Sequence, residues 1–299
     1  MIKNILILFT GIFALSTASI MIRFCEDVPP VMIATYRMAI AGMIMVFFHT
    51  IILKKNFLKA GRNQLFLCML GGLFLSLHFV SWIASLKHTS VANSVVLVTT
   101  NPIFVGILSW LIFKERHSVY LFLGIILSLA GTMMMVFAKT GFESLPVLNS
   151  PSFLGDMLAL SGAVMASGYL IIGSRVRKNM GIIQYITLVY SFCALFLLLF
   201  SLASGASFSG YSRNSYIYMV LLALIPQLIG HTSFNWALRH ISSTNIAVTI
   251  LGEPVGTIIL ARLILDESIS IYQGAGIFLI FGAIILSYYK GRNVMLKKD

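Results

Sequence analysis

The chain has 299 residues, of which 59% are hydrophobic and only 10% are charged. Because soluble domains carry roughly 25% charged residues, this composition excludes a soluble protein of one or two domains. The formal net charge is +12, which in a soluble protein would suggest nucleic-acid binding. Here the basic residues lie between long apolar segments, so we expect their partner to be the head groups of a lipid bilayer and not nucleic acid.

Apolar segments of about 20 residues, the length that crosses roughly 30 Å of hydrocarbon as a helix, recur from Ile5 to Tyr289. The first of them follows Lys3 and resembles a signal peptide. It is longer than a usual signal core, and Ala14–Ala18 is a weak cleavage site, so we predict a retained span. We predict ten transmembrane helices, at residues 4–22, 30–53, 64–86, 91–113, 119–138, 153–173, 182–203, 216–238, 244–265 and 270–289.

Lysine and arginine predict the orientation of these spans. If the N-terminus lies in the cytoplasm, the outer connections hold only Arg23, Lys87, Lys139 and Arg213, and the inner connections and termini hold most of the other basic residues. This asymmetry follows the positive-inside rule. We therefore predict that both termini are cytoplasmic and that the protein lies in a cytoplasmic (inner) membrane.

The two halves of the chain resemble each other when the numbering is shifted by about 152 residues. His88 then meets His240, and further matches in register are Asn93 with Asn245, Pro102 with Pro254, and Glu115 with Glu267. Five spans in each half place the second half in the opposite orientation, which is a recurring design of secondary transporters. The predicted organisation is a first five-helix repeat at 1–140, a linker at 141–152, a second, inverted repeat at 153–290 and a basic cytoplasmic tail at 291–299.

Three short motifs resemble the EamA group of the drug/metabolite transporter superfamily. They are Thr99-Thr100-Asn101-Pro102 leading to Lys114-Glu115, Leu251-Gly252-Glu253-Pro254 leading to Asp266-Glu267, and Arg37-Met38-Ala39. The resemblance covers nearly the whole chain. It implies ten helices in two inverted five-helix repeats and the transport of metabolites, amino acids or drugs, often as export. Arg262 departs from the family pattern, which has a small or apolar residue there.

Three charged residues lie inside the predicted spans, where charge is costly and usually functional. These are Arg37, Glu253 and Arg262. Glu253 has three possible roles: it carries a coupling proton, it binds a substrate amine, or it forms a structural ion pair with an arginine. Arg262 lies about 13 Å along the same helix from Glu253, at 1.5 Å per residue. Arg37 is therefore the better ion-pair candidate.

Prolines at equivalent places in the two halves, Pro102 and Pro254, each follow a polar residue, Asn101 and Glu253. Proline removes a backbone donor and leaves an earlier carbonyl unpaired. Such breaks are tolerated in a membrane where they are packed by protein or line a cavity. They point to the substrate site, or alternatively to structural kinks without ligand contact.

Two polar stripes are expected on the third and eighth spans. Gln227, His231 and Asn235 recur at spacing four, and His78 and Trp82 share a face of the third span. Lipid cannot satisfy such side chains, so they must face other helices or water. The histidines could relay protons or bond between helices, and the indole could stack on a substrate or only pack.

Motifs for chemistry are absent from the sequence. There is no GxxxxGK[ST] loop, no GxSxG elbow and no metal or redox spacing of Cys25, Cys68 and Cys193. We expect no enzyme activity, cofactor or metal.

The sequence instead predicts a secondary transporter for a small polar metabolite, an amino acid or similar zwitterion or anion, with protons as a possible coupling ion. A passive channel and a lipid-modifying membrane enzyme are the alternatives. The predicted substrate-binding residues are Arg37, His78, Trp82, Asn101, His231, Asn235 and Glu253; the predicted coupling or gating residues are Glu253, His231 and Arg262.

Overall fold

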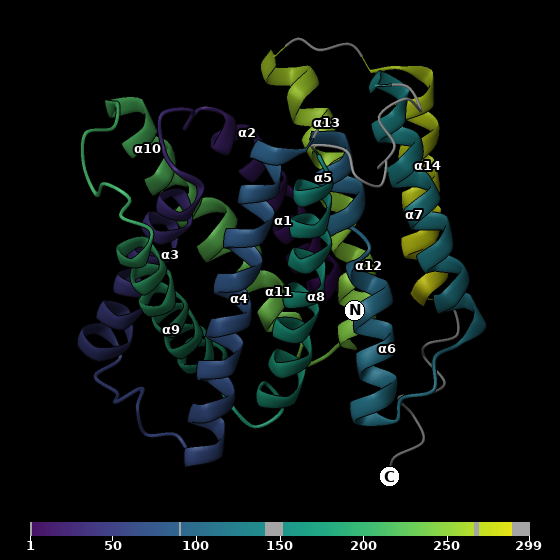
Figure 1. Ribbon diagram of the computed structural model, residues 1–299. Helices are drawn as coiled ribbons and strands as arrows, with labels where there is room; N and C mark the ends of the chain where they lie inside the picture. The colour runs from purple at the N-terminus through teal and green to yellow at the C-terminus, as the bar shows by residue number, and fades with distance from the viewer. Residues whose placement is uncertain (1, 90, 141–151, 266–268, 289–299) are drawn as a thin grey trace.

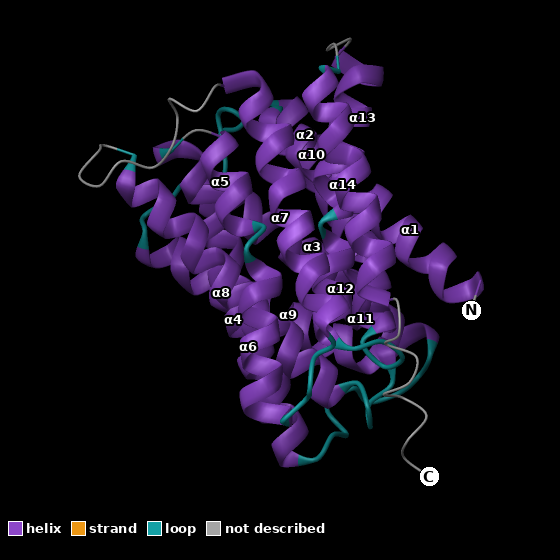
Figure 2. Ribbon diagram, turned by 90° about the vertical axis from the view of Figure 1, so that its right-hand side faces the viewer, coloured by secondary structure: helices purple, strands orange, loops and turns teal. Residues whose placement is uncertain are grey.

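The computed structural model describes residues 2–89, 91–140, 152–265 and 269–288, and the described chain is helical with no strand. Figure 1 shows the helices packed side by side along one common direction, and Figure 2 shows that loops gather at the two ends of the bundle. The α-helices are α1 (Ile2–Ser16), α2 (Ala18–Arg23), α3 (Pro30–Phe47), α4 (Arg62–His88), α5 (Val91–Val98), α6 (Asn101–Phe113), α7 (Val119–Thr140), α8 (Phe153–Val176), α9 (Ile182–Ala203), α10 (Arg213–Leu222), α11 (Thr232–Ala237), α12 (Ser243–Ile250), α13 (Gly252–Leu265) and α14 (Ile271–Tyr288).

The predicted spans correspond to helical stretches of the structure. Among the described residues, nine stretches are long and apolar enough to cross a membrane, and a shorter apolar stretch, Val119–Met135, lies where the fifth span is predicted. The predicted all-helical class is therefore confirmed for the described residues, and the lengths and composition of the helices fit a membrane protein. The predicted linker at 141–152 and the tail at 291–299 lie, apart from Ser152, outside the described residues.

Small residues allow the helices to approach one another closely. The neighbouring pairs with the most extensive contact are α4 with α8 and α7 with α14. Where α7 crosses α14, a Cβ on Gly276 would lie 2.6 Å from the carbonyl oxygen of Gly131. Since lipid tails are as apolar as leucine, helix association in a membrane depends on such close van der Waals packing.

Three predicted spans are not continuous helices. Two of the breaks lie ahead of the prolines from which the sequence predicts them, and the break in the first span corrects the prediction of one continuous helix. The first span breaks at Thr17, whose hydroxyl donates to the carbonyl of Ala14 at 2.7 Å. The other two break a few residues before their prolines, at Thr99 and Thr100 ahead of Pro102 and at Leu251 ahead of Pro254, so that each proline lies in the first turn of the following helix. At both proline breaks the backbone switches to bonds three residues apart, because proline has no N–H for the α-helical ladder.

The eighth span also departs from the prediction, because Ala223–His231 is a π-helix. Pro226 lies inside it and removes one donor from the ladder. The α-helical spacing that placed Gln227, His231 and Asn235 on one face is therefore wrong for this segment. Gln227 is fully buried against α3, whereas His231 and Asn235 face the interior cavity described below.

Figure 1 shows that the two proline-containing pairs of helices run in opposite senses. The chain passes downward from α5 to α6, and it passes upward from α12 to α13. The ends of α2 and α13 and the start of α14 lie at the upper end of the bundle, and the end of α8 lies at the lower end.

Candidate functional site

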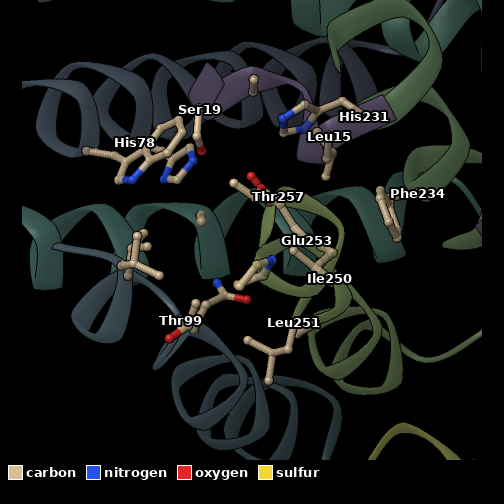
Figure 3. Close-up of a pocket in the computed structure, with 18 of the residues that line it drawn as sticks. Leu15, Ser19, His78, Thr99, His231, Phe234, Ile250, Leu251, Glu253 and Thr257 are labelled. Carbon is tan, nitrogen blue, oxygen red and sulfur yellow. The ribbon is translucent and has the colours of Figure 1, made fainter. Parts of the chain in front are cut away.

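A cavity of about 390 Å³ lies at the centre of the bundle, where the broken helices meet (Figure 3). Its walls include residues from both sides of each break: Leu15 and Ala18, Val98 and Asn101, and Ile250 and Glu253. His231 enters from the last turn of the π-helix. Irregular backbone inside a membrane occurs where it is packed by protein or lines a cavity. These breaks are packed by neighbouring helices and also border the cavity.

The mouth of the cavity lies at the upper end of the bundle in Figure 1. Among the described residues that line the cavity, the exposed ones are Arg23, the last residue of α2, and Ile269, just before α14. Deeper in, the lining is buried or half-buried, down to Phe234 and Asn235 on α11. The cavity is therefore accessible from one end of the bundle.

Arg37 carries a buried positive charge at the cavity wall. Its side chain is 1% exposed, its Nε donates to Oε1 of Gln227 at 3.0 Å, and its guanidinium carbon lies 4.4 Å above the ring of Phe79. A desolvated cation–π contact stabilises by about 2 kcal/mol, which is less than the several kcal/mol of desolvating an ion. Arg37 Nη2 and Gln227 Nε2 are both buried without a hydrogen-bond partner. The guanidinium of Arg37 and the neighbouring amide of Gln227 thus each have an N–H donor without an acceptor.

Glu253 carries a carboxylate into the same cavity from the second residue of α13. Its backbone carbonyl accepts a hydrogen bond from the Ser16 hydroxyl at 3.0 Å, and Pro254 follows directly in the wall. Among the described residues, none pairs with or donates to the carboxylate itself. The direct ion pair with Arg37, one of the three alternatives left open by the sequence, is therefore not formed. The two charges attract each other without contact.

Two histidines and a tryptophan line the cavity from α4 and from the π-helix. His78 Nδ1 donates to the carbonyl of Gly162 at 2.9 Å, so Nε2 is the acceptor when the ring is neutral. Its ring stacks on Trp82 with centroids 6.0 Å apart, and Trp82 Nε1 is buried without a partner. The ring of His231 packs edge-on against Phe79. Figure 3 shows His78 and His231 around the same space as Glu253.

The two asparagines hold neighbouring helices together at the cavity wall. Asn101 Nδ2 donates to the carbonyl of Ala163 and to the hydroxyl of Ser167, both on α8. Asn235 Oδ1 accepts from Tyr169 at 2.7 Å, and its Nδ2 donates to Tyr190 at 3.3 Å. Their polar groups thus serve helix contacts as well as the wall.

The structure brings most of the predicted site residues together, with two exceptions. Arg37, His78, Trp82, Asn101, His231, Asn235, Glu253 and Pro254 all line the cavity. Pro102 is buried at the start of α6 but outside the lining. Arg262 is exposed on α13 and also lies outside the lining, since nine residues separate it from Glu253 along the helix.

Four polar residues at or behind the cavity wall are missing from the predicted site. Ser19, Thr257 and Tyr169 line the cavity, and Tyr190 bonds to Asn235 behind it. Thr257 lies four residues after Glu253, and Ser19 lies three residues after Ser16, so helical spacing could have found these two; Tyr169 has no polar residue at such a spacing. Only the packing of separate helices shows which of them reach the interior.

Comparisons with known proteins identify the family. The model of the EamA-like transporter family matches residues 2–137 and again 153–289. An uncharacterized transporter of Archaeoglobus fulgidus is 22% identical over 267 residues, which cover 89% of this chain and 90% of the relative. The uncharacterized transporter YdfC of Bacillus subtilis is 23% identical over 265 residues, covering 89% and 84%.

Two further similarities concern a shorter stretch of the chain and the fold. Solute carrier family 35 member G1 of Mus musculus is 26% identical over 171 residues, covering 56% of this chain and 46% of the relative. A solved crystal structure matches with a TM-score of 0.82 over 98% of both chains at 18% identity, which indicates a shared fold. The chain, with its helices apolar enough to span a membrane, belongs to the EamA-like transporter family.

Proposed function

We propose that the protein is a secondary transporter that carries a small zwitterion, such as an amino acid, across the cytoplasmic membrane by alternating access. The observation that carries this proposal is the pair Arg37 and Glu253, which line one cavity without pairing with each other. A buried ion without a close partner is strongly unfavourable. A ligand that brings both opposite charges would relieve both residues at once.

The chemistry of the cavity favours this substrate class. The carboxylate of the ligand binds the donors of Arg37, whose planar guanidinium suits a carboxylate group. The ammonium group binds Glu253, and the hydroxyl oxygens of Ser19 and Thr257 in the same lining provide further acceptors. A hydrophobic cation fits least, because it would leave Arg37 buried without an anion.

Alternating access rests on two inverted repeats, at 1–140 and 153–290. The double match of one family model and the opposite courses of α5–α6 and α12–α13 support this organisation. In such transporters the substrate site lies between the repeats, at discontinuous helices near the membrane midplane. Both proline breaks border the cavity, as this design requires.

Coupling to protons is proposed for Glu253, with His78 and His231 as neighbouring groups that can exchange protons. A carboxylate that faces a cavity without a fixed partner is free to bind either a proton or a substrate ammonium group. Competition between these two cations provides the coupling. Glu253→Gln should then abolish the effect of a pH gradient on flux in proteoliposomes. Normal transport by this variant that still follows the gradient would exclude the proton role.

Ligand binding tests the charge assignment before any flux is measured. Purified protein is screened by thermal shift with amino acids, the matching amines that lack the carboxylate, and the N-acetylated acids that lack the ammonium group. We expect amino acids to raise the unfolding temperature of the wild type. Arg37→Gln should lose this response, and Glu253→Gln should no longer distinguish amino acids from N-acetylated acids.

Two exposed residues give matched controls, Arg175→Gln and Glu26→Gln, which make the same changes of charge outside the cavity. Both should respond to ligands as the wild type does. An equal loss of response in Arg175→Gln would show a general effect of charge and contradict the assignment of Arg37. In flux measurements the carrier predicts saturation with substrate, whereas flux that rises without limit would indicate a channel.

A further inference from the structure

Arg177 caps the end of α8 that lies away from the mouth of the cavity. Its side chain is 2% exposed, although it directly follows the last residue of the helix. Its Nε donates to the carbonyl of Asn235 at 3.0 Å, and its Nη1 donates to the carbonyl of Met180. A single guanidinium thus joins α8, α11 and the segment that enters α9.

The bond to Asn235 connects Arg177 to the floor of the cavity. The side chain of Asn235 lines the cavity, and its backbone carbonyl lies in the last turn of α11, where helices leave carbonyls unpaired. Asn235 therefore lies between the cavity, which its side chain lines, and the guanidinium of Arg177, which binds its backbone carbonyl. The mouth, at Arg23 and Ile269, lies at the opposite end of the bundle.

The side chains around Arg177 are closely packed, and one hydroxyl group among them has no hydrogen-bond partner. A Cβ on Gly173, one turn earlier in α8, would lie 2.7 Å from Leu238 Cδ1 and 2.9 Å from the hydroxyl of Tyr185. That hydroxyl is buried without a hydrogen-bond partner. Arg239, which follows α11, adds electrostatic repulsion against Arg177. The buried guanidinium of Arg177 is thus held by two carbonyl oxygens and repelled by a second cation.

We infer that the hydrogen bonds of Arg177 hold a gate closed at the end of the cavity opposite its mouth. In the closed state its two bonds hold α8, α11 and the α9 entry together beneath Asn235. Release of these bonds lets the ends of α8 and α11 separate and exposes the cavity to the other side of the membrane. The inference rests on the proposed alternating-access function, since a gate at this end is needed only if the cavity opens to both sides.

The test measures access to the cavity and needs no substrate. Ala166, a small residue of the cavity lining on α8, is replaced by cysteine. A membrane-impermeant maleimide is added to vesicles of each orientation. The native cysteines are all buried, and protein without the added cysteine gives the background. Asn179→Cys, an exposed position beside Arg177, marks the side of the membrane at which the gate lies.

In the wild-type background, Ala166→Cys should react mainly from the side opposite the Asn179 marker. Arg177→Ala should raise its rate of reaction from the marker side by about tenfold or more, since it removes two hydrogen bonds to a charged group. Arg177→Lys, which keeps the charge but cannot bridge two carbonyls in the same way, should give an intermediate rise. Arg175→Ala removes an exposed arginine two residues away and should change nothing.

Equal reaction rates in Arg177→Ala and Arg175→Ala, with both proteins monodisperse, would overturn the gate. So would failure of both Arg177 variants to fold when Arg175→Ala folds, because Arg177 would then be a residue needed for folding alone. If the maleimide results are as expected but no saturable flux is found, the gate stands and the proposed transport of zwitterions fails. The two inferences are thus distinguished.

Discussion

Asp27, in the connection between α2 and α3, shows how a single polar residue joins segments that are distant in the sequence. Its Oδ2 accepts from the backbone N–H of Ser212 at 2.6 Å, and its Oδ1 accepts from the hydroxyl of Ser215. These two serines form the start of α10, where Ser212 is the N-cap. The hydrogen bonds from Ser215 and Ser212 lower the pKa of Asp27 below its ordinary value of 3.8.

Asp27→Asn should lower the thermal stability of the protein at neutral pH, because an amide NH₂ would face the Ser212 or Ser215 donors. Because the pKa of Asp27 is lower in the folded than in the unfolded protein, its carboxylate stabilises the fold fully at pH values above the unfolded pKa of 3.8. This stabilisation is lost as the pH falls through the folded pKa. The difference in unfolding temperature between wild type and variant should therefore be full at pH 7 and shrink below about pH 4. Thermal unfolding in detergent at several pH values measures it.

Glu26→Gln is the control for this prediction, since it changes the neighbouring exposed carboxylate, for which no hydrogen bond is present in the described structure. Its effect on unfolding temperature should be small at each pH. A difference for Asp27→Asn that stays constant between pH 7 and pH 3 would show that the carboxylate charge does not stabilise the start of α10.

At the scale of elements, the crossing of α1 and α13 determines where Glu253 lies. The hydroxyl of Ser16 donates to the carbonyl of Glu253, and the hydroxyl of Thr257 donates back to the carbonyl of Ser16 at 3.0 Å. A Cβ on Gly256 would lie 2.1 Å from Ser16 Oγ. The two helices thus meet directly at the break in α1, and α13 can only approach this closely with glycine at 256.

Gly256→Ala should destabilise the folded protein by about 1–3 kcal/mol, the usual cost of overpacking a close contact. Gly274→Ala on α14, where an added Cβ meets nothing within 4 Å, should be neutral or stabilising, because alanine favours a helix by about 1 kcal/mol over glycine. Reversible unfolding or thermal midpoints in detergent compare the two. The double variant Ser16→Gly with Gly256→Ala should regain part of the loss, because the clashing side chain is removed. Additive losses would contradict this contact.

At the scale of the whole molecule, the distribution of basic residues makes a prediction about sidedness. Asn56, after α3, and Ser207, between α9 and α10, are both exposed. Single cysteines at these positions should react with an impermeant maleimide from opposite sides of the membrane, with 56 cytoplasmic and 207 external. Reaction of both from one side would contradict the span count and with it the inverted repeats.

The sequence by itself determined the class of protein, and it pointed to charged residues inside the predicted spans. Runs of about 20 apolar residues predict membrane-spanning helices. The charged residues within them, Arg37 and Glu253, stand out because burial of charge is costly. The paired prolines also predicted the helix breaks at residues 99–100 and 251, because proline cannot donate to the α-helical ladder.

Only the tertiary structure decided how these residues act together. The break at Thr17, the π-helix around Pro226 and the role of Arg177 depend on contacts between segments far apart in the chain, such as Ser16 with Glu253 and Arg177 with Asn235. The sequence also left open a direct pair of Arg37 and Glu253, because hydropathy gives the depth of a residue but not the direction of its side chain. Which side chains share a cavity is determined by the packing of helices, and this packing depends on small residues and hydrogen bonds that have no periodic signal in the sequence.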